Sequence, residues 1–500
     1  LYVENIVWEQ INNFYEMTQS EVKARENLKR SNFVAWLPRL LTQVEKSSGE
    51  PSVELQKNNV LRCDSWLQKN LLTEGRAAVM AERMVTLWQE QPTFHLIMTL
   101  NGHELPLLSD TLESLQKQLY QAWGLTIISN IAKPDVFEEL PENIEWLEIQ
   151  DGINEDIDKS VKEAGLDWVM RLLPGDKLFP HGLLSFAEAI NFKSNNKFIY
   201  SDEITDEEMP SIDFKPDFNL EMLRSRSYLG RSAIVRRDVL QEVGGFSSFA
   251  YVEVTDLCFK VYESYGQAAI GHIEEVLFTA SQHSVDEDLL KANEFATRQG
   301  HFIRMGLNVA MAQSEDNLFH IDYQHEASPM VSIIIANKNN ATMMARCLDM
   351  LVGKQTYSNI EIIVVDQMSD VEDLKYIYQE ASDKCEGRFK LYPFQSDNYS
   401  AMINYGAQQA KGEYITVLAS TAQSVYENWL ENLLSQVQCS DVGVVGARII
   451  DENNNLAHGG GVLGATNDVI GMFSGLADSE AGYMDRAHIA QEYAAISSAC

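Results

Sequence analysis

Short apolar segments alternate with amphipathic segments from about residue 93 onward. Apolar runs with the length of buried strands occur at 95–100, 125–129, 144–149 and 168–173. Between them, apolar positions at three- and four-residue intervals predict helices at 107–120 and 157–164. Strands that alternate with helices predict βαβ units, in which a mostly parallel sheet carries helices on its faces.

The same order of elements recurs about 235 residues later. The recurring pattern predicts strands at 331–336, 360–366, 389–393 and 414–418, with helices at 343–352 and 401–410. Recurrence of a whole element order indicates an internal duplication of a domain. Because ligands of parallel sheets bind beyond the carboxyl ends of the strands, candidate chemistry is expected there.

Two segments lie outside this pattern. Residues 1–90 are expected to form a helical N-terminal segment or linker, interrupted by a polar loop at 47–52, because apolar residues recur at helical spacing at Ile6, Trp8, Ile11, Phe14 and Tyr15. Residues 314–330 are polar and aperiodic, which predicts a linker. The expected organisation is a helical segment at 1–90, a first domain at 91–313, a linker at 314–330 and a second domain at 331–500.

Composition narrows the classes of partner. The chain carries 39 basic and 73 acidic residues, a formal net charge of −34, which repels polyphosphate backbones and argues against nucleic acid as a partner. The same acidity is also explained by solubility alone. Six scattered cysteines show no CxxC or zinc-type spacing, which indicates free thiols in a reducing compartment. No apolar run approaches the roughly 18 residues that span a bilayer. We therefore expect a cytoplasmic location, the inner face of a membrane included.

Several segments of the second domain, taken together and in order, resemble bacterial family-2 glycosyltransferases, whose domains have the GT-A fold. They are VSIIIANKN at 331–339, IEIIVVDQMSD at 360–370, NYSAMIN at 398–404, KGEY at 411–414, WLENLL at 429–434, VGVVGA at 442–447 and AHGGGVLG at 457–464. In the first domain, YSDE at 200–203, FKPDFN at 214–219, VGGF at 243–246 and DL at 256–257 resemble the second half of such a domain. The resemblance implies an α/β chain with two tandem GT-A domains.

The resemblance also implies a chemistry. Such a domain transfers a sugar from a nucleotide-diphosphate donor to a glycan or lipid-linked acceptor, with inversion, as in the building of O-antigen and other cell-surface polysaccharides. An acidic motif binds Mn²⁺ or Mg²⁺, which neutralises the diphosphate. One carboxylate acts as general base toward the acceptor hydroxyl, and another holds the nucleoside.

In the second domain, Asp366 fits the nucleoside role, because it ends an apolar strand and precedes two residues expected to cap a helix, Ser369 and Asp370. The alternative is that Asp366 only caps a turn. The resemblance adds Asn337, Ser369 and Asn404 to the nucleotide-sugar site.

The metal motif of the second domain departs from the family. Ala419-Ser420-Thr421 stands where relatives carry an acidic residue, and hydroxyls are poor ligands for a hard cation.

Gly459–Gly461 is expected to form a tight turn, and His458 beside it is a candidate acceptor-side residue. Because both ends of the chain look cut, at Leu1 and Cys500, the catalytic base and further transferase domains are expected in the flanks.

The first domain departs from the family pattern at other positions. Ser129 or Asn130 stands where the nucleoside carboxylate is expected, and the metal motif, Pro174-Gly175-Asp176, keeps one acid. Asp176 is a candidate metal ligand, with ordinary turn chemistry as the alternative.

On the acceptor side of the first domain, Val254 replaces the expected base, which leaves Glu253 as the substitute, and Asp202, Glu203 and Asp256 are further candidates. A lone histidine, His283, follows where relatives carry a His-containing motif and is expected to have a structural role or to lie at the surface.

Two functions follow from these features, an active glycosyltransferase and a catalytically silent scaffold that binds a sugar or nucleotide beside an active partner. An unrelated nucleotide-binding enzyme is disfavoured, because no GxGxxG motif follows a first strand.

Overall fold

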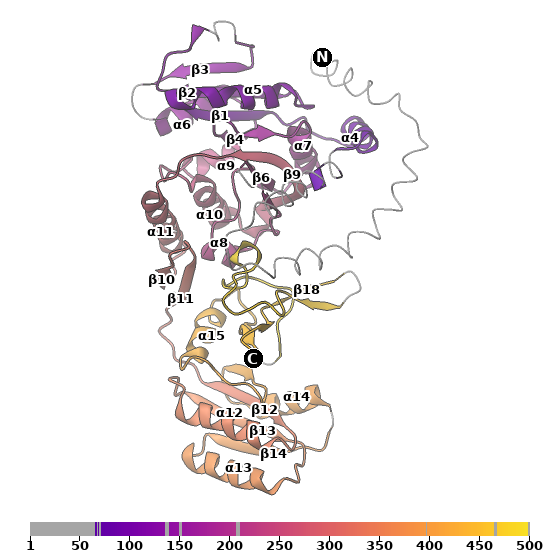
Figure 1. Cartoon of the computed structure of the whole chain (residues 1–500), viewed down its shortest axis with the longest axis vertical. Coiled ribbons are helices and arrows are strands. Elements are labelled where there is room, and N and C mark those ends of the chain that lie inside the picture. The colour runs from indigo at the N-terminus through magenta and orange to yellow at the C-terminus, as the bar shows by residue number, and fades with distance from the viewer. Residues whose placement is uncertain are drawn as a thin grey trace. The chain divides into compact units, whose positions relative to one another are not determined.

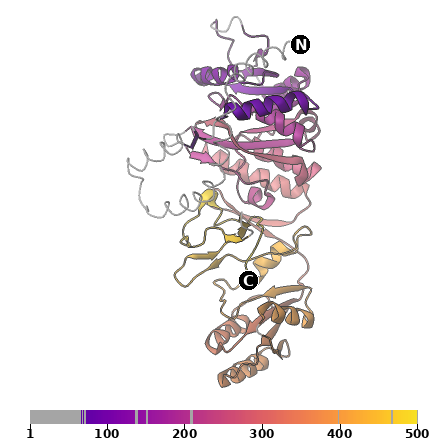
Figure 2. The ribbon, with the colours of Figure 1, turned by 90° about the vertical axis from the view of Figure 1, so that its right-hand side faces the viewer.

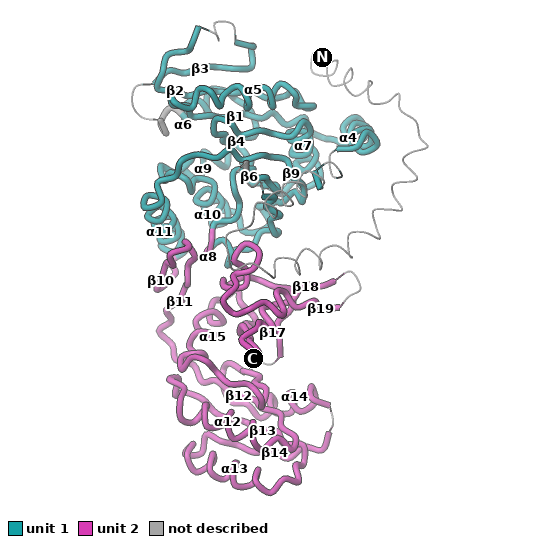
Figure 3. The backbone as a smooth tube through the Cα atoms, in the orientation of Figure 1, with its two compact units in different colours: residues 1–223, 227–305 teal, residues 224–226, 306–500 magenta. Residues whose placement is uncertain are grey.

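The computed structural model describes residues 66–67, 69, 72–135, 140–149, 153–206, 211–396, 398–464 and 468–498. These residues form two compact units (Figure 3). Unit 1 comprises residues up to 223 together with 227–305, and unit 2 comprises 224–226 and 306–500. The apolar positions predicted as helical between Ile6 and Tyr15 and the loop predicted at 47–52 lie outside the described residues.

Unit 1 is built on a nine-stranded mixed sheet (Figure 1). Eight of its strands follow the order β3-β2-β1-β4-β8-β6-β9-β5, and β7 pairs with β6. The first half is parallel and consists of β1 (Phe94–Leu100), β2 (Trp123–Ser129), β3 (Ile144–Glu148) and β4 (Trp168–Leu172). The second half is mostly antiparallel and consists of β5 (Lys177–Leu178), β6 (Phe198–Asp206), β7 (Ser211–Asp213), β8 (Ala233–Arg236) and β9 (Ile270–Ser281).

Helices cover both faces of this sheet, as Figures 1 and 2 show. Alternate residues of β1 join a core with α4 (Glu74–Thr86), α5 (Leu108–Gln116) and α7 (Gly182–Phe192). The other face of β1 and β2 contacts α6 (Ile153–Ala164). Further helices described in unit 1 are η1 (Gly102–Leu107), α9 (Arg237–Glu242), α10 (Glu253–Tyr265), η3 (Gln267–Ala269) and α11 (Glu287–Arg304), while α8 (Leu220–Ser225) begins in unit 1 and ends in residues assigned to unit 2.

Unit 2 contains a four-stranded parallel sheet in the order β14-β13-β12-β15. Its elements alternate along the chain as β12 (Val331–Asn337), α12 (Ala341–Gly353), β13 (Ile360–Asp366), α13 (Glu372–Lys384), β14 (Phe389–Pro393), α14 (Tyr399–Gln409), β15 (Tyr414–Val417) and α15 (Trp429–Val437). All seven residues of β13 are buried, because α12, α13 and α15 pack on one face of the sheet and α14 packs on the other.

The parallel parts of the two sheets share one order and one register. In each, the third, second, first and fourth strands lie side by side in that sequence. Phe94 pairs with Trp123 and Val331 with Ile360, a separation of 29 positions in both units, and each pairing runs for seven residues. The last pairs are Leu100 with Ser129 and Asn337 with Asp366, so corresponding strand ends can be compared directly.

The stretch predicted as a linker, 314–330, and the one predicted as a helical segment or linker, 1–90, both contain residues packed into a core. Within 314–330, β11 (Phe319–Tyr323) pairs antiparallel with β10 (Val309–Gln313), and the alternating side chains of Phe319, Ile321 and Tyr323 are buried. Within 1–90, Met80 of α4 is buried in the core of unit 1. Alternate apolar residues in a polar stretch are thus enough to anchor a short strand.

The end of the described chain is less regular. It contains β16 (Ile449–Ile450), β17 (Leu456–His458), β18 (Gly461–Leu463), β19 (Val469–Gly471) and η4 (Tyr483–Asp485). Gly460, between β17 and β18, has a φ of 103°, and the tight turn predicted for the glycine run stays a prediction. Among the residues described here, no helix is long and apolar enough to span a bilayer.

Two buried histidines make the stability of unit 1 sensitive to acid. His95 lies on β1, where its Nε2 is 2.9 Å from the Thr126 hydroxyl, and burial lowers its pKa to about 4. Burial, followed by the charge of Arg76, lowers the pKa of His181 to about 4 as well. The unfolded chain therefore binds more protons than the folded chain between pH 6.5 and 4, so stability falls as the pH falls through that window.

We expect His95→Gln to flatten this acid dependence. Each histidine accounts for a loss on the order of 3 kcal/mol between pH 6.5 and 4, by the linkage between pKa and stability. Urea denaturation of unit 1 at a series of pH values measures the slope, and the exposed His103→Gln serves as the matched control. Equal slopes for wild type and His95→Gln would contradict this assignment.

Candidate functional site

The carboxylate of Asp366 lies at the carboxyl end of β13, only 6% exposed, and is held by four donors. Its Oδ2 accepts hydrogen bonds from the hydroxyls of Tyr378 (2.6 Å) and Ser369 (2.9 Å) and from the amide of Asn337 (3.4 Å). Its Oδ1 accepts one hydrogen bond, from the backbone N–H of Ser369 at 2.7 Å. A carboxylate oxygen accepts two or more hydrogen bonds, so Oδ1 retains acceptor capacity.

Asn337 contributes a second acceptor beside Asp366. Its side chain is 2% exposed, and its amide nitrogen also donates to the Tyr378 hydroxyl at 2.8 Å. Within the described part of the chain, its Oδ1 has no hydrogen-bond partner. A buried acceptor without a hydrogen-bond donor lowers the stability of the fold, so each such atom needs an explanation. A ligand that donates a hydrogen bond to it is one such explanation.

The loops after β12 and β13 are joined around this cluster. The hydroxyl of Ser369 accepts from the backbone of Asn339 at 2.9 Å, and the side chain of Asn339 accepts from the backbone of Asp370 at 3.0 Å. Asn339 and Met368 have positive φ values of 51° and 50°. Non-glycine residues rarely adopt this conformation, and such strain concentrates at ligand sites.

The predicted capping roles of Ser369 and Asp370 were wrong. α13 begins at Glu372 with Val371 as its N-cap, and Ser369 bonds back to Asp366 instead. The Asp366 carboxylate accepts hydrogen bonds from both donors of Ser369, and Ser369 therefore belongs to the cluster around Asp366 and does not cap α13.

Tyr378 belongs to the cluster and was not predicted from the sequence. It lies on the buried face of α13 with Leu374 and Ala381, a helical spacing that identifies the face without showing its partner. Burial, and then the hydrogen bond to Asp366, raises the pKa of its hydroxyl, which therefore stays protonated and donates.

Other predicted residues of unit 2 lie elsewhere. Asn404 is on the exposed side of α14 and makes none of the described hydrogen bonds to the Asp366 cluster. His458 ends β17, and its Nδ1 accepts from the Gly460 backbone at 3.2 Å. Ser420 and Thr421 follow β15, which pairs with β12 at the point where the strand order reverses. Their roles toward a sugar, an acceptor or a diphosphate stay predictions.

In unit 1, the strand end that corresponds to Asp366 carries Ser129. Its hydroxyl donates to the Leu100 carbonyl at 2.9 Å and accepts from the backbone of Ile131 at 3.3 Å. A residue with one hydroxyl that is already engaged in this way cannot replace a carboxylate as an acceptor for a nucleoside.

Asp176 ends a tight turn that follows β4. The backbone N–H of Asp176 bonds to the Leu173 carbonyl at 3.0 Å, and Gly175 between them has a φ of 92°, as a type II turn requires. The Asp176 side chain is fully buried, and its Oδ2 accepts from the Leu173 backbone at 2.8 Å. This geometry confirms the turn role that the Pro-Gly-Asp sequence left open.

The oxygens of Asp176 are taken by protein donors. Arg231 approaches them with Nη2 at 2.7 Å and Nε at 3.3 Å, and both the backbone N–H and the hydroxyl of Ser281 lie 2.8 Å from Oδ1. These residues do not fit a divalent metal, because no lone pair of the carboxylate remains open to one. Among the described residues, no group of three His, Cys, Asp or Glu side chains is placed to hold a metal ion.

His283 supports the same turn. Its Nε2 lies 3.0 Å from the Pro174 carbonyl and 2.9 Å from the Ser281 hydroxyl, and its Nδ1 lies 3.3 Å from Glu104. These contacts match the structural role, one of the two expected for this histidine.

Asp202 and Glu203 lie in β6 and are turned into the protein. Asp202 accepts from the Lys215 backbone at 2.8 Å and lies 3.2 Å from His272. Glu203 accepts from the backbone of Arg231 at 2.9 Å and lies 3.2 Å from the Lys215 ammonium group. Both carboxylates have internal partners, and a role of either toward an acceptor stays a prediction.

Glu253 and Asp256 lie in the first turn of α10. Glu253 is paired with Arg171 of β4 at 3.2 Å and remains partly exposed. Asp256 is buried and paired with Lys260 at 2.8 Å. Of the two, Glu253 is the carboxylate that solvent can reach.

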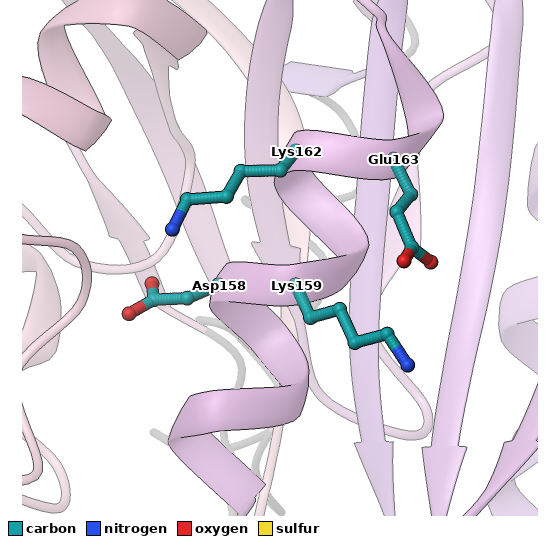
Figure 4. Close-up of a pocket in the computed structure, with 4 residues that line it drawn as sticks. All are labelled: Asp158, Lys159, Lys162 and Glu163. Atoms are coloured by element: carbon teal, nitrogen blue, oxygen red, sulfur yellow. The ribbon is translucent and has the colours of Figure 1, made fainter.

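A shallow depression of about 360 Å³ lies over α6, bordered by Asp158, Lys159, Lys162 and Glu163 (Figure 4). Two acidic and two basic side chains border it, on a helix that covers the sheet. Because it does not lie at the carboxyl ends of the strands, we assign no ligand to it.

We expect Tyr378→Phe to destabilise unit 2 by about 1.5–3 kcal/mol, the usual contribution of a hydrogen bond to a charged group. Hydrogen exchange of unit 2 peptides in increasing urea measures the change. Tyr376→Phe is the matched control, because Tyr376 lies on the same helix and is 73% exposed. Equal effects of the two substitutions would show that Tyr378 does not hold Asp366.

Comparison with known proteins identifies the domain around Asp366. Residues 332–468 match the family model for glycosyl transferase family 2. The O-antigen biosynthesis protein RfbC of Myxococcus xanthus is 25% identical over 79% of this chain, and the protein y4gI of Sinorhizobium fredii is 25% identical over 87%. This chain spans 32% of RfbC and 50% of y4gI.

Two further similarities cover less of the chain. The glycosyltransferase GlyG of Streptococcus pneumoniae is 34% identical over 119 residues, 24% of this chain and 38% of GlyG. The structure of S. aureus TarS in complex with UDP-GlcNAc aligns with 41% of this chain and 65% of that chain, at 14% identity and a TM-score of 0.34. By the family match, residues 332–468 form a family-2 glycosyltransferase domain, and by sequence the chain is distantly related to RfbC.

Proposed function

We propose that the chain is part of a glycosyltransferase that transfers a sugar from a nucleotide-diphosphate donor to a growing cell-surface polysaccharide. Unit 2 would bind the donor, and both units would be GT-A domains in tandem. The observation that carries the proposal is the buried Asp366 cluster, which retains two unused acceptors at the ends of adjacent parallel strands.

These acceptors favour a nucleobase as the group bound. The free capacity of Asp366 Oδ1 and the unpartnered Oδ1 of Asn337 both call for an N–H donor. Imide and amino groups of nucleobases are such donors, whereas phosphate oxygens are repelled by a carboxylate. The exposed side chain of Met368 lies beside the cluster in the loop after β13 and offers an apolar surface to a ring.

The family match and the named relative support the rest of the proposal. Residues 332–468 include Asn337, Asp366, Ser369 and Tyr378. The similarity to a protein named for O-antigen biosynthesis favours a polysaccharide or lipid-linked glycan as acceptor. An inverting hexosyl transfer follows if this domain behaves as its family does.

A silent scaffold is the second candidate, and a specific observation favours it for unit 1. There, Asp176, Asp202 and Glu203 are engaged by internal partners, and Ser129 replaces the nucleoside carboxylate. Unit 1 would then support a transferase without binding a donor itself. Hydrolysis of, or transfer from, a donor by the chain would favour the first candidate, and nucleotide binding without turnover the second.

We expect Asp366→Ala to weaken nucleotide binding by roughly 10- to 100-fold, which corresponds to about 1–3 kcal/mol for a buried polar contact. Calorimetric titration of the whole chain with UDP, GDP, dTDP and ADP, with and without Mn²⁺, measures the affinities. Asp373→Ala is the matched control, because Asp373 is exposed on α13. A nucleotide that binds wild type and Asp366→Ala equally would remove Asp366 from the site.

A further inference from the structure

We propose that the guanidinium group of Arg231 is a resident cation that fills the cation position of unit 1, so that Asp176 binds no divalent metal. The inference concerns unit 1 alone and is independent of the nucleotide site proposed for unit 2. The acidic motif predicts Asp176 as a metal ligand, whereas this carboxylate makes its contacts with protein donors.

The surroundings of Arg231 Nη2 are those of a hard cation. Nη2 lies 2.7 Å from Asp176 Oδ1, 2.6 Å from the Ser281 carbonyl and 3.5 Å from the Ser281 hydroxyl. A carboxylate, a carbonyl and a hydroxyl are the oxygen ligands that Mg²⁺, Mn²⁺ and Ca²⁺ take in proteins. The guanidinium group therefore occupies a cage of oxygens that would otherwise suit a metal ion.

The position of this cage is that of a ligand site. Asp176 follows β4, which lies next to β1 in the parallel part of the sheet, and the last paired residue of β9, Ser281, meets it there. Such strand ends are where α/β sheets bind ligands. Arg231 supplies this buried carboxylate with a positive charge from within the protein.

A second set of charges fixes the backbone of Arg231. Glu203 Oε2 accepts from the backbone N–H of both Arg231 (2.9 Å) and Ser232 (3.0 Å). Gly230 has a φ of 65°, and a Cβ there would lie 1.9 Å from the Glu203 carboxylate, so only glycine fits this approach. The loop therefore fixes the backbone from which the Arg231 side chain reaches Asp176.

Lys215 completes this support. Its ammonium group lies 3.2 Å from Glu203 and donates to the carbonyls of Ser201 at 2.8 Å and Leu229 at 2.6 Å, with the side chain fully buried. The pairs Lys215–Glu203 and Arg231–Asp176 are both neutral. Because Asp176 cancels the charge of Arg231, the pair offers no net positive charge to a diphosphate, unlike a divalent metal.

Binding of Mn²⁺ to the nucleotide-free chain tests the proposal, measured by electron paramagnetic resonance. Wild type and Asp176→Asn should bind the same number of ions, because the carboxylate is not available to a metal. Arg231→Ala and Arg231→Gln should each bind one additional Mn²⁺ per chain, and Mn²⁺ should raise their melting temperatures.

The controls isolate the cage. Arg231→Lys keeps a cation and should gain no ion, and the double variant Arg231→Ala with Asp176→Asn should lose the gained one. Arg237→Ala removes the same charge from the start of α9 and should leave Mn²⁺ binding unchanged. The proposal is overturned if wild type holds an ion that Asp176→Asn loses, or if a folded Arg231→Ala or Arg231→Gln gains none. If both Arg231 variants fail to fold, the comparison of wild type with Asp176→Asn still tests the proposal. Equal Mn²⁺ binding supports it, and an ion lost in Asp176→Asn overturns it.

Discussion

A carboxylate buried at the end of a parallel strand must be satisfied, and the two units do this in different ways. In unit 2, Asp366 is surrounded by hydroxyl, amide and backbone donors, which carry no net charge. In unit 1, Asp176 is neutralised by the guanidinium group of Arg231. Neutral donors leave the carboxylate its charge and spare acceptor capacity, whereas an ion pair consumes both.

This difference has consequences for function because the two units present comparable strand ends. The register that pairs Asn337 with Asp366 pairs Leu100 with Ser129 in unit 1, so the acceptor pair of unit 2 is replaced by a leucine and an engaged serine. Arg231 also pairs with Asp176. Unit 1 therefore has the same strand order as unit 2 in its parallel part, but the polar residues at its strand ends bond to other groups of the protein. The proposed division of labour, with donor binding in unit 2 and support in unit 1, follows from these contacts.

The sequence predicted the parallel strands well, since a continuous apolar run bounded by polar residues has few alternatives. The predicted strands at 360–366 and 389–393 have the bounds of β13 and β14. The strand end at Asp366 followed from the same pattern, whereas Asn337 lies one residue beyond the strand predicted at 331–336 and came from the family resemblance. The hydrogen-bond partner of Ser369 was harder to predict. Whether Ser369 bonds to Asp366 or caps the following helix depends on distances in the folded chain.

Partners that are distant along the chain could not be predicted at all. Arg231 lies 55 residues from Asp176 and carries no local motif, so nothing in the sequence shows that the acid of Pro174-Gly175-Asp176 is already paired. Tyr378 could be placed on a buried helical face by its spacing from Leu374 and Ala381, but its contact with Asp366 required the fold. Helix faces and strand ends are local properties, whereas the pairing of charges depends on tertiary structure.

Hydrogen exchange of the whole chain with and without a saturating nucleotide tests the central claim most directly, because it reports on both units in one sample. The account predicts that protection appears in the loops at 337–340 and 366–371 of unit 2, while the turn at 173–176 and the loop at 229–232 of unit 1 exchange as before. Protection of the unit 1 turn, with no change around Asp366, would contradict it.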